Sequence, residues 1–353
     1  MTTIAQLVEV HRLAVAGQEA GIARDAGNRV AKRWLRRSRF TDVVVLANAT
    51  LTLGPYAAAL HDLGAAQAST GQSRQALGTY ERALHLYREA KDRAGEAATL
   101  GNVGLVYDGF GDRQQALTCY RQALAINQEV GNRVNEAATL CNIGALYNGL
   151  GERQKALTYH RQALTITQEE GDRAGEAAIL TNIGSVYKDL GEWQQALTYL
   201  RQALPIRREI GDRAGEASTL SSIGSAWRGL GDLQQALTYF QQSLLMSREV
   251  GDRPVQAVTL NNLGLLYQQA GDQQQALTHY QQALDILRDV GDRPVEAVTR
   301  YNIAMIHRAE GDLDRAISEL EIVVELDREV EHPDLASDTA ALERLRRERG
   351  EAP

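Results

Sequence analysis

A repeat with an interval of forty residues runs through most of this chain and constrains its fold more than any other feature. The 353-residue sequence superimposes on itself at this interval without a gap, which aligns a column of glycines and a column of alanines. The glycines are Gly71, Gly111, Gly151, Gly191, Gly231, Gly271 and Gly311, and the alanines are Ala76, Ala116, Ala156, Ala196, Ala236, Ala276 and Ala316. A fixed period of this length predicts one structural unit stacked many times.

Each unit has the pattern of two amphipathic helices. In the unit that begins near residue 174, Leu180, Gly184 and Tyr187 follow at spacings of three and four, so they share one helix face. A second apolar stripe runs over 196–206, and Gly191 stands between the two stripes, where a left-handed residue can end a helix. The unit is therefore predicted to be a helical hairpin.

The pattern predicts an all-α protein, because one hairpin cannot bury its own apolar face and must stack on its neighbours. We expect about seven hairpins over 54–330, an N-terminal helical segment over 1–53, and a C-terminal capping helix with a tail over 331–353. The N-terminal segment carries neither the glycine column nor the alanine column, so it is interpreted as a degenerate repeat or a cap.

These columns resemble the tetratricopeptide repeat family. The family's pattern corresponds here to Leu140, Ile143, Gly144, Tyr147, Gly151, Ala156, Tyr159 and Ala163. The period is longer than the usual thirty-four residues, and the segments 171–177 and 182–184 are similar to the long-repeat subclass of Pins/LGN adaptors, kinesin light chains and bacterial regulators. The resemblance implies a right-handed α-α superhelix whose first helices line a concave groove that binds proteins or peptides.

The resemblance also implies a polar column along that groove. The column contains Asn102, Asn142, Asn182, Ser222, Asn262 and Asn302. An amide can donate and accept hydrogen bonds, which suits the backbone of an extended peptide. The alternative is that each asparagine bonds a neighbouring helix terminus.

A second groove column changes sign along the chain. It contains Asp108, Asn148, Lys188, Arg228, Gln268 and Arg308. Together with Arg300 and Tyr301 in the last unit, it predicts that the C-terminal half binds an acidic segment of the ligand, because arginine can contact a carboxylate through two hydrogen bonds. A solvated charged face is the alternative.

Several other classes of function have little support in the sequence. The seven histidines are scattered, and neither a zinc-binding His-Glu-x-x-His pair nor a phosphate-binding glycine loop is present, so we expect no enzyme, metal or cofactor. The net charge of -7 argues against general attraction to nucleic acid or to a membrane. Cys119 and Cys141 are too few for a disulfide framework, which favours the cytoplasm.

Two regulatory functions remain as alternatives to an interaction scaffold. A basic cluster over 24–39 accompanies Ala23 and Gly27, whose spacing is that of a DNA-binding helix-turn-helix in a peptide-sensing regulator. Arg33 opposes this, because it stands where the recognition helix should bury an aliphatic residue; a capping helix with a basic outer face is favoured. The other alternative is the sensor part of a multidomain ATPase or protease.

Overall fold

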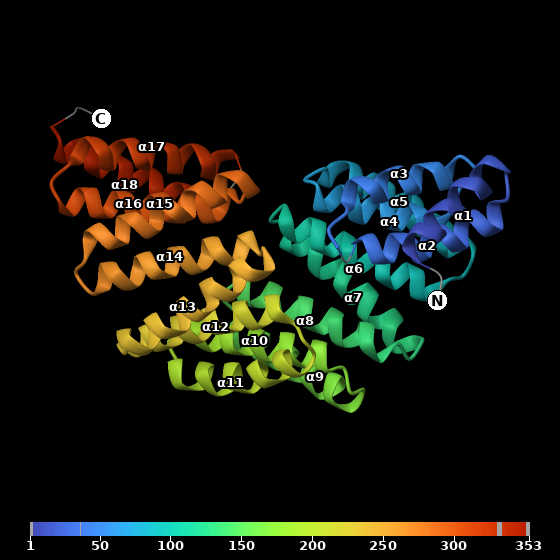
Figure 1. The fold of residues 1–353 in the computed structure, drawn as a ribbon, viewed down its shortest axis with the longest axis horizontal. Helices are drawn as coiled ribbons and strands as arrows, with labels where there is room; N and C mark the ends of the chain where they lie inside the picture. The colour runs from blue at the N-terminus through green and yellow to red at the C-terminus, as the bar shows by residue number, and fades with distance from the viewer. Residues whose placement is uncertain (1–2, 36, 330–333, 351–353) are drawn as a thin grey trace. The chain divides into compact units, whose positions relative to one another are not determined.

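The structure, a computed structural model, describes residues 3–35, 37–329 and 334–350. Within these ranges every regular element is an α-helix (Figure 1). The helices form two compact units, Met1–Glu170 and Gly171–Pro353. The repeat runs unbroken through residue 170, so the sequence did not indicate this division; the predicted boundaries at 53 and 330 remain predictions.

The first unit contains three N-terminal helices and three hairpins. The N-terminal helices are α1 (Ile4–Ala16), α2 (Ala20–Leu35) and α3 (Phe40–Leu51). The hairpins are α4 (Ala57–Ser69) with α5 (Ser73–Glu89), α6 (Arg93–Gly109) with α7 (Arg113–Glu129), and α8 (Arg133–Gly149) with α9 (Arg153–Glu169).

The second unit contains four hairpins and a last helix. The hairpins are α10 (Arg173–Asp189) with α11 (Trp193–Glu209), α12 (Arg213–Gly229) with α13 (Leu233–Val250), α14 (Arg253–Gln269) with α15 (Gln273–Val290), and α16 (Arg293–Ala309) with α17 (Leu313–Glu329). The last helix is α18 (Leu335–Glu348). The expectation of an all-α solenoid of seven hairpins is confirmed.

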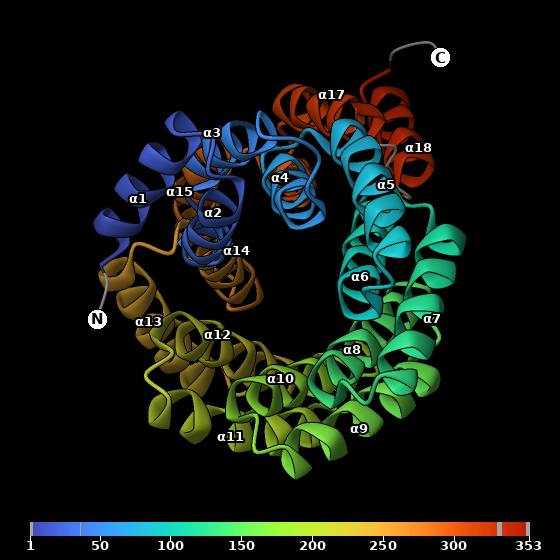
Figure 2. The ribbon, with the colours of Figure 1, turned by 90° about the vertical axis from the view of Figure 1, so that its right-hand side faces the viewer.

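The first helices of successive hairpins line the inner side of each row. Helix α4 contacts α6, and α6 contacts α8, in the first unit; α10, α12, α14 and α16 do the same in the second. The second helices make no comparable contact with one another in the described ranges. Figure 2 shows the same order within each unit, with α4, α6 and α8 on the inner side of α5, α7 and α9.

The glycines within the first helices are required by close packing between the two helices of a hairpin. A Cβ atom placed on Gly104 would lie 2.5 Å from a ring carbon of Tyr120, and one on Gly184 would lie 2.7 Å from Leu200. Tyr120 and Leu200 each stand four residues after the alanine column and are buried. The glycine column therefore serves packing.

A repeated three-residue phrase that ends in arginine, Lys-Asp-Arg at 91–93 and Gly-Asp-Arg at 211–213, ties helix ends together through its charged residues. Arg93 at the start of α6 donates to Glu96 at 2.5 Å and to Glu129 at the end of α7 at 2.6 Å. Arg88 at the end of α5 also donates to Glu96. Because equivalent pairs recur in later hairpins, such as Arg213 with Glu249, the phrase stabilises the stack.

The N-terminal helices pack on the first hairpin. Leu7, Val30 and Val43 of α1, α2 and α3 share a buried cluster with Ala66 of α4. Helix α3 was not predicted as an element of its own. Gly27 lies inside the continuous helix α2, packed against His11 and Thr50, so the structure does not form the helix-turn-helix that Ala23 and Gly27 were considered to mark.

At the other end, α18 packs on α17 through Leu342 and Leu345. The predicted cap over 331–353 includes residues 331–333 and 351–353, which lie outside the described residues. No helix among the described residues has the length and hydropathy to cross a membrane.

Candidate functional site

Three adjoining pockets hollow the inner face of the first unit, along α4, α6 and α8. Their volumes are about 420, 540 and 190 Å³, and they are called here the aromatic, acidic and amide pockets. The aromatic and amide pockets share Asn102, and the acidic and amide pockets share His61 and Ala98. The three pockets therefore adjoin one another along this face.

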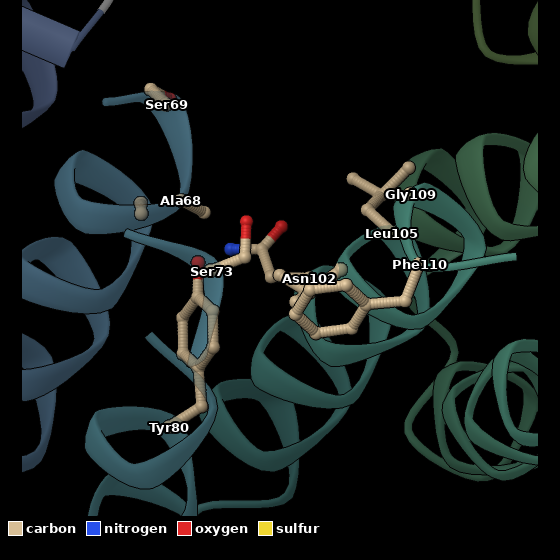
Figure 3. Close-up of a pocket in the computed structure, with 10 residues that line it drawn as sticks. Ala68, Ser69, Ser73, Tyr80, Asn102, Leu105, Gly109 and Phe110 are labelled. Carbon is tan, nitrogen blue, oxygen red and sulfur yellow. The ribbon is translucent and has the colours of Figure 1, made fainter. Parts of the chain in front are cut away.

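The aromatic pocket combines hydrogen-bonding groups with exposed apolar side chains. Figure 3 shows Ser73, Tyr80 and Asn102 pointing toward one another from α5 and α6, beside Leu105 of α6 and Phe110, which follows that helix. Leu105 and Phe110 are 50% and 44% exposed. Large apolar side chains that are exposed beside polar groups are typical of a binding surface.

The amide pocket places two of the predicted site residues side by side. Asn102 and Asn142 line it together with Asn127 and Asn135. The Asn142 side chain forms no hydrogen bond with the described residues, and Oδ1 of Asn127 is buried without a partner. The unbonded amide of Asn142 is therefore available to a bound peptide.

Members of the predicted amide column, Asn102 among them, also join neighbouring hairpins. Nδ2 of Asn102 lies 3.3 Å from Nε2 of His61, and Nδ2 of Asn262 donates to Oγ of Ser221 at 3.4 Å. In both cases the partner is a side chain on the first helix of the preceding hairpin. The alternative considered for the asparagines was a hydrogen bond to a neighbouring helix terminus. Asn182 and Asn302 are half-buried at the equivalent positions of α10 and α16.

The structure corrects the prediction for Arg300. Its side chain is only 4% exposed and donates to Glu296 at 3.0 Å and to Glu319 at 2.6 Å. Arg300 stands at the leucine position of the repeat, which points into the interior. Its charge is therefore already neutralised inside the hairpin, away from any ligand.

Tyr301 and Arg308 also have surroundings that oppose an acidic ligand. Tyr301 lines a pocket of about 270 Å³ with Asp327, Asp334 and Asp338. Arg308 is half-exposed and pairs with Glu348 of α18 at 2.5 Å. Carboxylates already occupy the neighbourhood of both residues.

Two further cations, Lys188 and Arg228, are predicted to contact an acidic ligand. They lie on α10 and α12, both half-buried. Burial lowers the pKa of Lys188; the adjacent Asp189 raises it, and the positive charge of Arg228 lowers it again. Burial also lowers the pKa of Arg228. Neither cation is hydrogen-bonded to a carboxylate in the described part of the chain. A bound anion would therefore stabilise the positive charge of both side chains.

Sequence reasoning missed Asp62, which lines the acidic pocket. Asp62 stands forty residues before Asn102, so it occupies the amide column in the first hairpin. Extending the amide column by one forty-residue repeat toward the N-terminus would have identified Asp62. Among the described residues, no group of three His, Cys, Asp or Glu side chains is arranged to hold a metal ion.

A row of helical hairpins with a hollowed inner face defines an α-helical repeat protein. The chain belongs to the tetratricopeptide repeat family: family models described as tetratricopeptide repeat match residues 55–129, 135–209, 215–289 and 297–330, more than half of the chain. A comparison with curated proteins found no match.

Solved structures with a similar fold have diverse functions. The Rap conjugation gene regulator of plasmid pLS20, in complex with the Phr* peptide, is 14% identical, with a TM-score of 0.64 over 94% of this chain and 96% of that one. Aspartyl phosphate phosphatase F from Bacillus subtilis is 13% identical, with a TM-score of 0.56 over 91% and 93%. A signal transduction ATPase with a tetratricopeptide repeat sensor, from Pyrococcus horikoshii, is 14% identical, with a TM-score of 0.58 over 94% and 52%. At these identities the similarity shows the fold alone.

Proposed function

We propose that this protein is a non-enzymatic, cytoplasmic interaction scaffold that binds a peptide or protein segment on the inner face of its first helices. The observation that carries the proposal is the set of adjoining pockets along α4, α6 and α8, with Asn102 and Asn142 in their walls. An extended segment has unpaired backbone N–H and C=O groups, and the two amides provide complementary partners for them. Leu105 and Phe110 provide apolar surface for a side chain.

The second unit supports a further part of this proposal, an acidic segment in the ligand. Lys188 and Arg228 would contact its carboxylates, since each lacks a hydrogen-bonded carboxylate of its own in the described residues. Arg300 is excluded from this role by its burial against Glu296 and Glu319. The proposed acidic preference therefore depends on Lys188 and Arg228.

A regulatory role is the second candidate, and the comparisons favour it. One similar structure is a gene regulator in complex with a peptide, and another contains a repeat sensor attached to an ATPase. In such a role, the same pockets would receive the signal. One protein with a similar fold is named as a phosphatase. That this chain has no catalytic activity is therefore itself part of the proposal.

The proposal can be tested with peptides selected on the intact protein from a random display library. Their dissociation constants are measured by fluorescence anisotropy for the wild type and for Asn142→Ala, which loses no internal hydrogen bond. Losing one peptide hydrogen bond costs about 1 kcal/mol, so we expect binding to weaken about fivefold, and by about thirtyfold when Asn102→Ala is added.

The matched control is the pair Gln114→Ala and Gln154→Ala, which removes two exposed amides from the second helices α7 and α9. Its dissociation constant should stay within about twofold of the wild type. If the asparagine variants bind as tightly as the control, or if no peptide is enriched, the proposed function is wrong.

A further inference from the structure

The acidic pocket lies where the N-terminal helices meet the first two hairpins. With a volume of about 540 Å³, it is the largest of the three adjoining pockets. Asn28 and Lys32 of α2, Tyr56 before α4, Asp62 of α4 and Tyr87 of α5 line it. No part of the proposed peptide contact with Asn102 and Asn142 uses these side chains.

Asp62 is the unusual member of this lining. Its residue is only 7% exposed, and it forms no hydrogen bond or ion pair with any described residue. Burying a carboxylate without a hydrogen-bond or ion-pair partner costs free energy, because the charge loses its hydration and no protein donor replaces the water. Burial raises the pKa of Asp62 to about 7, although the positive charge of Lys32 acts to lower it. Lys32 is exposed and does not come within ion-pair distance.

Two carboxylates line the pocket, and Asp62 is the buried one, whereas Asp92 is exposed. Burial lowers the pKa of His61 to about 4, so this ring is neutral, and its Nδ1 is 3.0 Å from Oγ1 of Thr99. Asp92 accepts a hydrogen bond from the backbone N–H of Gly95 as the cap of α6. The rings of Tyr56 and Tyr87 add aromatic surface, and a guanidinium, that of Arg24, already lies 5.0 Å from the centroid of Tyr56.

We propose that the acidic pocket binds an organic cation of the ligand, an ammonium or guanidinium group, through the carboxylate of Asp62. Such a group supplies the N–H donors that Asp62 lacks, in a charge-assisted hydrogen bond, and aromatic rings attract cations. The pocket joins the amide pocket at His61 and Ala98, so a peptide there can place a basic side chain or its amino terminus on Asp62. In this form, the inference rests on the proposed function.

Small probes test the cation site without the peptide. N-acetyl-argininamide carries the side-chain cation, and N-acetyl-citrullinamide is its neutral isostere. Glycinamide carries an amino-terminal cation, and N-acetylglycinamide is its neutral counterpart. Binding to the full chain is followed by methyl NMR, because Leu86, Ala90 and Ala98 line the pocket. We expect these methyl signals to shift with at least one cation, and the corresponding neutral probe to bind at least tenfold more weakly.

The variants separate the charge of Asp62 from a general effect. Asp62→Asn restores the amide that later hairpins carry at this register, so it should fold and should lose at least tenfold in affinity for the cation. Lys32→Gln removes a competing positive charge and should strengthen binding severalfold. Glu81→Gln, an exposed position on α5, is the control and should leave the affinity unchanged.

The outcomes also distinguish this site from the peptide-binding face. Equal affinity for each cation and its neutral isostere, unchanged affinity in Asp62→Asn, or unshifted pocket methyl signals would each overturn the inference. Cation binding that depends on Asp62, combined with peptide binding that ignores Asn102 and Asn142, would support the cation site and reject the proposed function. The better of the two cations identifies the source as a side chain or an amino terminus.

Discussion

One carboxylate in a column of amides distinguishes the first hairpin from those that follow. Asp62 stands at the register of Asn102 and Asn142, but it is buried without a hydrogen bond to the described residues. The repeat tolerates polar side chains at this position, because it faces the inner pockets and contacts the neighbouring first helix. An amide there can bond a neighbour, as Asn102 does with His61, whereas the carboxylate of Asp62 finds no donor.

The burial of Asp62 predicts a pH-dependent difference in stability. Its pKa in the folded state, about 7, lies above the unfolded value near 3.9. The folded state therefore binds the proton more tightly than the unfolded state. The free-energy cost of ionising Asp62 in the folded protein is absent below about pH 4, grows as the pH rises, and is complete above pH 7. Asp62→Asn removes this penalty.

In urea unfolding, Asp62→Asn should match the wild type near pH 4 and exceed it at pH 8, by as much as about 4 kcal/mol for a shift of about three pKa units. Other titrating groups are common to both proteins and cancel in the difference. A stability difference that is the same at both pH values would show that Asp62 is ionised freely in the folded protein.

Single residues were predicted less well than the repeat that contains them. The sequence placed Asn102 and Asn142 on the inner face, and both line pockets there. It assigned Arg300 to the ligand, although the residue replaces a core leucine. Its partner Glu296 lies one turn earlier on α16, and its partner Glu319 lies on α17, the other helix of the hairpin. Pairing of this kind depends on three-dimensional proximity that a column of residues does not reveal.

At the scale of helices, the repeat predicts the structure well because each of its small residues is required by one physical constraint. The packing of Gly104 against Tyr120 brings α6 and α7 together, and the glycines after the helices adopt positive φ, as at Gly191 with φ 73°. Helix α3 was not predicted, because its apolar residues Val43–Ala47 form a run without helical spacing. The helix becomes evident only from its packing with α2 and α4.

Two glycines of α6 should respond oppositely to the same substitution. In Gly104→Ala the new Cβ would lie 2.5 Å from the ring of Tyr120, so the ring or the helix must move, at a cost of about 1–3 kcal/mol. In Gly101→Ala the Cβ meets nothing within 4 Å, and the gain in helix propensity is about 1 kcal/mol. Thermal unfolding of both variants checks this. Destabilisation of similar size in the two would contradict the packing role of the glycine column.

At the scale of the whole molecule, stability comes from every hairpin of the stack, whereas the proposed binding surface covers only a few helices. Each hairpin contacts mainly its neighbours, so stability is spread along each row as a sum of local terms. Three adjoining pockets lie in the first unit along α4, α6 and α8, and a pocket of about 270 Å³ lies beside Tyr301 in the second unit. The forty-residue period therefore predicts the stack, while two departures from it, Asp62 and Phe110, line pockets that a ligand can occupy.

The central claim, that a peptide lies on the inner face of α4, α6 and α8, is tested most directly by photo-crosslinking. A peptide selected on the intact protein is synthesised with a diazirine side chain at successive positions, and the crosslinked residues are identified by mass spectrometry. We expect crosslinks to residues of the aromatic and amide pockets, including Leu105 and Phe110. Crosslinks confined to exposed residues of α7 and α9 such as Gln114 and Gln154, or absent from the residues that line the aromatic and amide pockets, would contradict the claim.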